Sequence, residues 1–309
     1  DPVGIPKSRH YGRTSGKGTS GKDVIRISLT EWEQAHLYVL HNTDEIEPYV
    51  EEHKDALRLI HGGRNENFIT KEHNRHFPNW LQRRINDEVE RNPNSVSENL
   101  RWLSNGPSFN VLSFNGYAIN GYTFYTNEHD TRSTMQNSGV TLVADSWHRA
   151  SAKDIHPIYA PMSYFGVIEQ IWELDYTMFR VPVFRCKWVN NNSGLRTDEL
   201  GFVQVDLSKV WYKDDPFILA SQAKQVFYVT DPAKKNWSIV LPSNKNHQEQ
   251  VDAESDEYLN IPEDDLSFEM LWSKYIDIDE DENEDEPFYM RHDHDEGNWF
   301  SNQTRKRKR

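Results

Sequence analysis

Two runs of alternating side chains, residues 164–176 and 179–189, constrain the fold of this chain more than any other feature. Both runs are rich in aromatic and β-branched residues and alternate with a period of two, which is typical of β-strands with one buried face. The polar segment 190–194 then predicts a turn. Shorter strand patterns follow at 201–207, at 217–219 with 225–229, and at 237–241. Five short strands without a long helix between them predict a small antiparallel β-barrel-like domain or rolled sheet over 157–242.

Two smaller signals refine the expected strands. Pro182 lies inside the second run, and because proline lacks an N–H it fits an edge strand or a bulge better than a central strand. The segment 114–124 contains two Asn-Gly pairs, which favour tight hairpin turns. This segment therefore predicts two short strands within a β-hairpin connector that spans 108–156.

The hydrophobic period of the earlier part of the chain is helical, which predicts a helical region over 29–107. Capping-box spacing, helix-starting proline and helix-ending glycine mark the boundaries of its helices. These signals predict one helix capped by Thr30 and Glu33, one from Pro48 to Gly62, one from about 71 to 91 that is bent or broken near Pro78, and one opened by Ser95 with Glu98 and ended by Gly106. The fold class expected is thus α+β, with helices first and strands after them.

Several blocks of the β-rich part resemble, in the same order, one family of plant proteins. The blocks are Tyr164–Ile168, Glu173–Tyr176, Phe184 with Cys186 and Trp188, Asp198 and Glu199 with Gly201 and Phe202, Phe217–Ala223, and Gln225–Val229. They are similar to the domain of unknown function numbered 4216, which lies downstream of the transposase domain in CACTA-type (En/Spm-like) DNA transposons.

Blocks in the helical part and the connector extend the same resemblance. These blocks are Ala35–Asn42, Pro48–His53, Leu103–Pro107 and Thr134–Val140, with a mild departure from the family beside Met135. The similarity then spans about Glu33 to Leu241, or two-thirds of the chain. The resemblance implies an accessory region of a transposon protein, because the catalytic acidic residues of such proteins lie in an upstream domain. It also implies a plant origin and a location in the nucleus.

The formal net charge of −14 is concentrated at one end of the chain. Residues 249–300 hold 20 acidic and 2 basic residues, whereas residues 1–248 are nearly neutral. Such a block of like charge stays solvated, which predicts a disordered acidic tail over 243–309. The tail ends in a basic cluster typical of nuclear-import signals, made of Arg305, Lys306, Arg307, Lys308 and Arg309. Residues 1–28, rich in Gly, Ser, Lys and Arg, predict a disordered basic linker.

Cysteine content and hydropathy exclude several classes of protein. Cys186 is the single cysteine, so intramolecular disulfides and cysteine-rich zinc sites are excluded, and a reducing compartment is expected. No apolar run approaches the length needed to cross a bilayer, and the first residues lack the pattern of a secretion signal. Because the chain begins with Asp1, we expect a fragment or a processed product.

Carboxylate and histidine residues are the candidates for metal or catalytic sites in this sequence. A two-metal nuclease would need separated carboxylates, for which the candidates beside strands are Asp145, Asp175, Asp198 and Asp206. The histidine pairs His36 with His41 and His73 with His76 have no cysteine partner and no metalloprotease motif, so core or surface histidines are favoured. We therefore expect no catalytic residue, no metal, no cofactor and no small-molecule substrate in this chain.

Basic and aromatic residues alternate in the β-rich part, as they do in small nucleic-acid-binding barrels. The candidates for nucleic-acid contact are Arg180, Arg185, Lys187, Trp188, Arg196, Lys209, Trp211 and Lys213. The expected function is a non-catalytic accessory region that docks protein partners or DNA in a transposition complex. Two alternatives stay open: part of a metal-dependent transposase or nuclease, and a host-recruited chromatin-associated regulatory protein.

Overall fold

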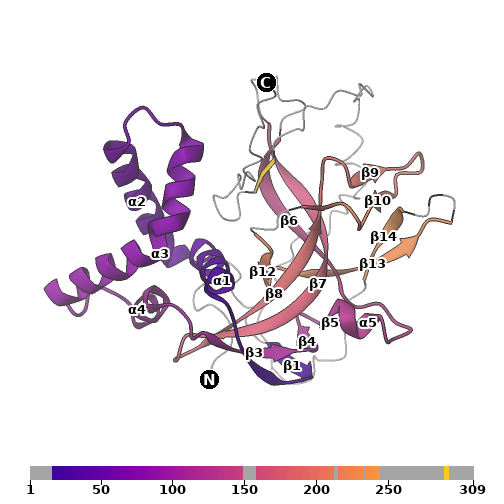
Figure 1. Ribbon diagram of the computed structural model, residues 1–309, viewed down its shortest axis with the longest axis horizontal. Helices are drawn as coiled ribbons and strands as arrows, with labels where there is room; N and C mark the ends of the chain where they lie inside the picture. Colours follow the sequence, from indigo (N-terminus) through magenta and orange to yellow (C-terminus); the bar gives the residue numbers. More distant parts are fainter. Residues whose placement is uncertain are drawn as a thin grey trace, which may run out of the picture.

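The computed structural model describes residues 16–148, 158–211, 215–232, 234, 236–243 and 289–291. Lys213, the basic cluster 305–309 and almost all of the predicted acidic tail lie outside this part. The helices between residues 29 and 105 lie on one side of the molecule, and the strands within 195–205 and 224–242 lie on the other (Figure 1). The long strands within 139–189 lie between these two groups. The predicted mixture of helices first and antiparallel sheets after them is confirmed.

The helices carry most of the residues between 29 and 105. Their bounds are α1 Leu29–His41, the 3₁₀ helix η1 Asp44–Ile46, α2 Glu47–Ile60, α3 Glu66–Arg91 and α4 Glu98–Asn105, and the short α5 is Asn127–Asp130. Pro48 occupies the first turn of α2, as predicted. Pro78 lies inside α3, where proline removes a backbone hydrogen bond, and the two halves of α3 run in different directions in Figure 1.

Two helices begin at a serine two positions away from the predicted boundary. The capping box of α1 joins Ser28 and Glu31 rather than Thr30 and Glu33, with both reciprocal bonds formed. Likewise Ser97, and not Ser95, accepts a hydrogen bond from the Leu100 amide and caps α4. In both places the sequence offers two capping candidates within three residues.

The strands form a three-stranded sheet and a large antiparallel sheet. The three-stranded sheet has the order β1-β4-β5, with bounds β1 Gly16–Ser20, β4 Gly116–Ile119 and β5 Tyr122–Tyr125. The strands of the large sheet are β2 Asp23–Arg26, β3 Asn110–Phe114, β6 Gly139–His148, β7 Ile158–Asp175, β8 Arg180–Val189, β9 Leu195–Thr197, β10 Val203–Val205, β11 Val210–Trp211, β12 Phe217–Leu219, β13 Lys224–Thr230, β14 Ser238–Pro242 and β15 Tyr289–Arg291. Its main path runs β11-β8-β7-β6-β13-β14-β10-β9.

The described strands form no closed barrel, so the predicted barrel is wrong. Closure within 157–242 would require these strands to pair only with one another. Instead, one edge of β7 pairs first with β6 and then with β3, both of which precede residue 157 in the sequence. The other edge of β7 pairs with β8 from Gly166 to Asp175. The sheet therefore stays open and extends through strands from the N-terminal half.

Pro182 lies in a central strand, against expectation. β8 pairs with β7 on one edge and with β11 and β12 on the other, and Pro182 faces Glu173 in the β7 ladder. The Pro182 carbonyl accepts a hydrogen bond of 3.0 Å from the Ala220 amide just beyond β12. The register of the β7–β8 ladder also shifts between Ile168 and Gln170, which makes Glu169 the extra residue of a β-bulge.

Part of the predicted disordered linker forms strands. β1 pairs with β4 and β2 pairs with β3, both antiparallel. A side chain at Gly18 would meet the Phe114 ring at 2.1 Å, so glycine lets β1 lie directly on this ring. The residues that suggested a linker thus serve close backbone packing, and the linker prediction is wrong for 16–26.

One continuous core joins the helices to the sheet. It combines buried residues of α1 and α3, such as Leu40 and Phe77, with Trp172 and Leu174 of β7 and Phe217 of β12. A second cluster lies between the large sheet and the three-stranded sheet, and a third lies under β10, β13 and β14. None of the helices in the described residues is long and apolar enough to cross a membrane.

The observed capping box of α1 predicts a difference between two neighbouring substitutions. We expect Ser28→Ala to lower the free energy of unfolding by about 1 kcal/mol, because it removes the acceptor for the Glu31 amide. Thr30→Ala, two residues further along and exposed, should change it by less than about 0.5 kcal/mol. Urea denaturation of both variants measures this, and a larger loss in Thr30→Ala would contradict the assigned cap.

Candidate functional site

Three of the predicted nucleic-acid contacts lie on β8, and each is paired with an acidic side chain. Their closest N···O distances are 3.8 Å for Arg180 with Glu173, 3.6 Å for Arg185 with Glu31 and 2.6 Å for Lys187 with Glu169. Arg185 also donates a hydrogen bond of 3.0 Å to Gln170. Carboxylates therefore offset the charges that would attract phosphate, so these residues serve mainly to join α1, β7 and β8.

The two predicted tryptophans differ in exposure. Trp188 is completely buried in the core between the two sheets and offers no face to a ligand. Trp211, its partner across the β8–β11 ladder, keeps 43% of its surface exposed. Trp188 therefore cannot stack on a nucleic-acid base, whereas the exposed part of Trp211 could do so. Lys213 lies outside the described residues.

The remaining two predicted residues, Arg196 and Lys209, converge on Trp237. The Arg196 guanidinium carbon lies 3.7 Å from the centre of the Trp237 ring, and the Lys209 ammonium nitrogen lies 5.7 Å from it. Both distances fit cation–π contacts. Arg196 is fixed further because its Nε and Nη2 donate to the Gln204 side-chain oxygen at 2.9 and 2.7 Å. Trp237 was missed as a site residue, since it is some forty residues from Arg196 in sequence.

One face at the same end of the sheet carries exposed apolar side chains, although Gln204 on this face is buried. We define the outer face as the side of β9, β10, β13 and β14 that carries Arg196, Gln204, Phe227, Val229, Ile239 and Leu241, which cross-strand pairing places together. Val229 is 47% exposed and Leu241 is 38% exposed. The opposite side of these strands packs into the third core cluster through Val203, Val205 and Val240. In Figure 1 this part of the sheet lies away from helices α1–α4.

Apolar residues beside the outer face are exposed too. Phe202, next to β10, keeps 47% of its surface in contact with solvent. The turn before it is held by the Asp198 carboxylate, which accepts from the Leu200 and Phe202 amides at 3.0 and 2.8 Å. Clustered exposed apolar side chains are typical of interaction surfaces rather than of ordinary solvent-facing sheet. The alternation in β13 and β14 was the available signal for this face.

The carboxylates considered for a nuclease site are occupied by local contacts. Asp175 accepts from the Thr177 amide at 2.8 Å, and Asp206 accepts from the Ser208 amide and hydroxyl at 3.0 and 2.6 Å. Asp198 holds the turn described above, and the Asp145 side chain lies outside the described part. Across the ranges that the structure describes, no group of three or more His, Cys, Asp or Glu side chains could hold a metal ion.

A buried carboxylate on β7 also has neighbouring partners. Glu173 accepts a hydrogen bond of 2.9 Å from the Tyr117 hydroxyl, and it is the ion-pair partner of Arg180. Burial, together with the negative charge of Glu173, raises the pKa of Tyr117, so the phenol stays protonated and keeps donating at neutral pH. This contact ties the three-stranded sheet to β7 and is structural.

Several of the histidines lie in the core, and Cys186 is buried and forms no disulfide. His36 Nδ1 lies 3.0 Å from the Tyr176 hydroxyl, and burial lowers the pKa of His36 to about 3. The predicted neighbours His73 and His76 do not act as a pair, because His73 is buried and His76 is largely exposed beside Glu72. His73 instead contacts His41 and His53.

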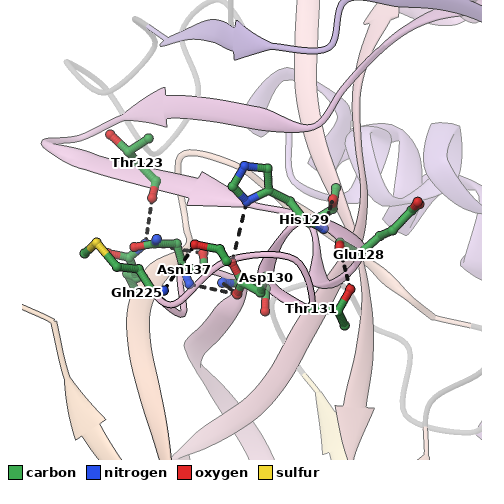
Figure 2. A network of polar contacts seen from close by, with 11 residues as sticks. Thr123, Glu128, His129, Asp130, Thr131, Asn137 and Gln225 are labelled. Carbon is green, nitrogen blue, oxygen red and sulfur yellow. Dashed lines mark hydrogen bonds and ion pairs between the residues drawn. The ribbon is translucent and has the colours of Figure 1, made fainter.

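A polar network closes the loop between β5 and β6 (Figure 2). One oxygen of Asp130 accepts from the Asn137 and Ser138 amides at 2.8 and 2.7 Å, and the other faces His129 Nδ1 at 4.0 Å. Gln225 of β13 donates to the carbonyls of Thr123 and Asn137 at 2.7 and 3.3 Å. The carboxylate thus holds the two ends of the loop together. Although histidine beside aspartate is a pattern found in catalysis, a separation of 4.0 Å is too long for a hydrogen bond.

Comparison with known proteins identifies one segment of the chain. Residues 172–240 match the family described as "Domain of unknown function (DUF4216)". The matched segment runs from the end of β7 into β14 and contains Arg196, Lys209 and Trp237. No curated protein and no solved structure matches the chain. The class of this segment is therefore a domain whose family description assigns no function.

The Asp130 network predicts a large stability loss from a single surface-loop substitution. We expect Asp130→Ala to lower the free energy of unfolding by about 2 to 3 kcal/mol, because two amides lose a charged acceptor in a largely buried position. Glu128→Ala, in the same loop, removes only an exposed ion pair with Arg132 and should cost less than about 0.5 kcal/mol. Equal losses in urea denaturation would contradict this role of Asp130.

Proposed function

We propose that this chain is a non-catalytic binding region of a protein derived from a CACTA-type transposon, and that it works in the nucleus. The residue blocks between Glu33 and Leu241 that resemble this class of protein support the origin. The family match over 172–240 is consistent with it. The basic cluster 305–309 supports nuclear import. Docking to protein partners or DNA, rather than chemistry, would then be the contribution of this region.

The observation that carries the proposal is the outer face with its cationic border. Its centre is apolar and exposed at Val229 and Leu241, and its border holds the Arg196 side chain against Trp237. Interfaces between proteins combine an apolar centre with a polar rim and are enriched in tryptophan and arginine. Because Gln204 and Trp237 already hold Arg196 in place, a partner would lose little side-chain freedom on binding.

These features favour a protein partner over DNA. A DNA-binding surface gains most of its affinity from uncompensated lysine and arginine side chains. Arg180, Arg185 and Lys187 each lie beside a carboxylate, and Trp188 is buried, so half of the predicted DNA contacts are already engaged within the molecule. Apolar side chains at the centre of the outer face match a protein surface better than a phosphate backbone.

DNA is the second candidate ligand because two of the predicted cations do gather at one place. The charged groups of Arg196 and Lys209 both lie within cation–π distance of the Trp237 ring. Trp211, two residues after Lys209, is exposed. Single-stranded nucleic acid binds to such mixtures of basic and aromatic side chains. Binding of this kind would weaken steeply with salt, whereas apolar docking would not.

A substitution in the centre of the outer face tests the proposal. We expect peptides selected from a displayed random library against the full chain to bind Val229→Asp at least about tenfold more weakly, because a charge would enter the apolar centre. Val143→Asp is the matched control, since Val143 is a β6 valine of similar exposure, 51%, away from this face. Fluorescence anisotropy with labelled peptides gives both dissociation constants.

The possible outcomes of this experiment distinguish docking at the outer face from its absence and from DNA binding. Selective weakening in Val229→Asp supports docking at the outer face. Equal affinities of both variants, or a failure to select any binding peptide, would contradict it. A parallel titration with labelled single- and double-stranded DNA separates the two ligand classes. Salt-dependent DNA binding that Arg196→Met abolishes and Val229→Asp leaves intact would replace protein with DNA as the ligand.

A further inference from the structure

Three buried histidines, one from each of three helices, form a chain of ring contacts. His73 of α3 is fully buried in the middle, with its Nε2 3.2 Å from His41 Nε2 of α1 and its Nδ1 2.9 Å from His53 Nδ1 of α2. Both outer rings are buried as well. Contacts between ring nitrogens therefore join α1 to α3 and α3 to α2. Neither the family resemblance nor the outer face accounts for it.

The groups around this chain favour uncharged rings. Phe77 stacks on His73 with ring centres 4.4 Å apart, and Trp80 lies 4.7 Å from His53. The groups that lower the pKa of His73 and His53 electrostatically are other histidines of the chain, the buried Lys54 of α2 and, toward His53, His76 of α3. All of them are bases, and the carboxylate of Glu72 lies 3.5 Å from His76 on the exposed side of α3. A proton added to the chain would thus enter an apolar, base-lined space.

The number of protons decides whether both ring contacts are hydrogen bonds. A neutral imidazole has one N–H donor and one acceptor nitrogen, so three neutral rings satisfy both contacts in either direction along the chain. His73 would donate to one neighbour and accept from the other. If both outer rings become charged, each directs an N–H at His73, which has only one acceptor nitrogen. One contact then brings two donors together and is lost.

We propose that the chain His41–His73–His53 is an acid-sensitive latch that holds α2 and α3 to α1 at neutral pH and releases them as the chain takes up protons. Release would loosen α2 and the first half of α3, where His53 and His73 lie. The large sheet and α4 would keep their packing, because they carry none of the three rings. The latch would thus make exposure of this helical pair depend on the acidity of the compartment.

The pKa changes agree in sign with this proposal. Burial lowers the pKa of His53 to about 4 and also lowers that of His73, with the neighbouring bases adding to the effect. A histidine whose pKa is lowered by folding contributes stability that is fully present above its ordinary pKa of about 6.5. That stability is lost as the pH falls from 6.5 toward 4. Burial also lowers the pKa of His36, but His36 contacts Tyr176, which follows β7, and is not part of the chain. A measurement resolved along the sequence is therefore needed to separate the effect of His36 from that of the chain.

Hydrogen exchange of the full chain, resolved by peptide and corrected for the intrinsic effect of pH, tests the latch. Between pH 7.5 and 5.0 we expect protection of α2 and the first half of α3 to fall by at least tenfold, with little change in β7 and β8. His53→Asn keeps an acceptor or donor near the position of Nδ1 without a titrating ring, and His41→Gln does the same for Nε2. Each variant should make the fall in protection at least threefold smaller than in the wild type, although the lowered pKa of His73 keeps part of the pH dependence.

His61→Gln is the matched control, because His61 lies at the end of α2 outside the chain and should retain the full pH dependence. If His53→Asn fails to fold, His41→Gln alone still decides the matter, since the two act on different ring contacts. An equal loss of protection in helices and sheet of the wild type would overturn the proposal. So would an unchanged pH dependence in the folded variants. Neither result depends on what binds the outer face.

Discussion

The antiparallel pairing of β7 with its three neighbours is the interaction on which the rest of the structure depends. One edge of this strand holds β8, and the other holds β6 and then β3. Because the bulge at Glu169 adds one residue, Ile168 and Ile171 face the same core cluster although they are three positions apart. The other side of β7 contacts the third cluster through Phe165 and the helices through Trp172. A single strand thus positions all three cores.

Much of the fold followed from local patterns, whereas contacts between distant segments did not. Alternation identified β7 and β8, and the Asn120-Gly121 pair marked the β4–β5 turn, where both residues have positive φ. The barrel was predicted because the alternation shows which residues form strands but not which strands pair. β3 and β6 could not be recognised as partners of β7 from their own sequences. β1 was missed because Gly and Ser are poor strand formers by propensity, whereas Gly18 allows this strand to lie directly on the Phe114 ring.

The candidate site shows the same limit. Interleaved basic and aromatic residues correctly drew attention to Arg196 and Lys209, which do meet. The pattern could not reveal that Glu31, at the start of α1, reaches Arg185 on β8, or that Trp188 faces inward. Trp237 became part of the site only through the pairing of β10 with β14. Similarly, the histidine spacings in the sequence suggested His73 with His76, while the packing of three helices joins His73 to His41 and His53.

The strand partners of β7 also show that the segment matched by the family differs from the folding unit. The family match begins at residue 172, fourteen residues after β7 starts, and it excludes β3 and β6. A recombinant fragment with the matched boundaries would keep only the last four residues of β7, so it would leave much of one edge of β8 unpaired and Trp172 without its helical neighbours. Such a fragment would be prone to aggregate. Residues 172–240 are therefore not a folding unit of their own, and expression boundaries are better chosen from the sheet than from sequence similarity.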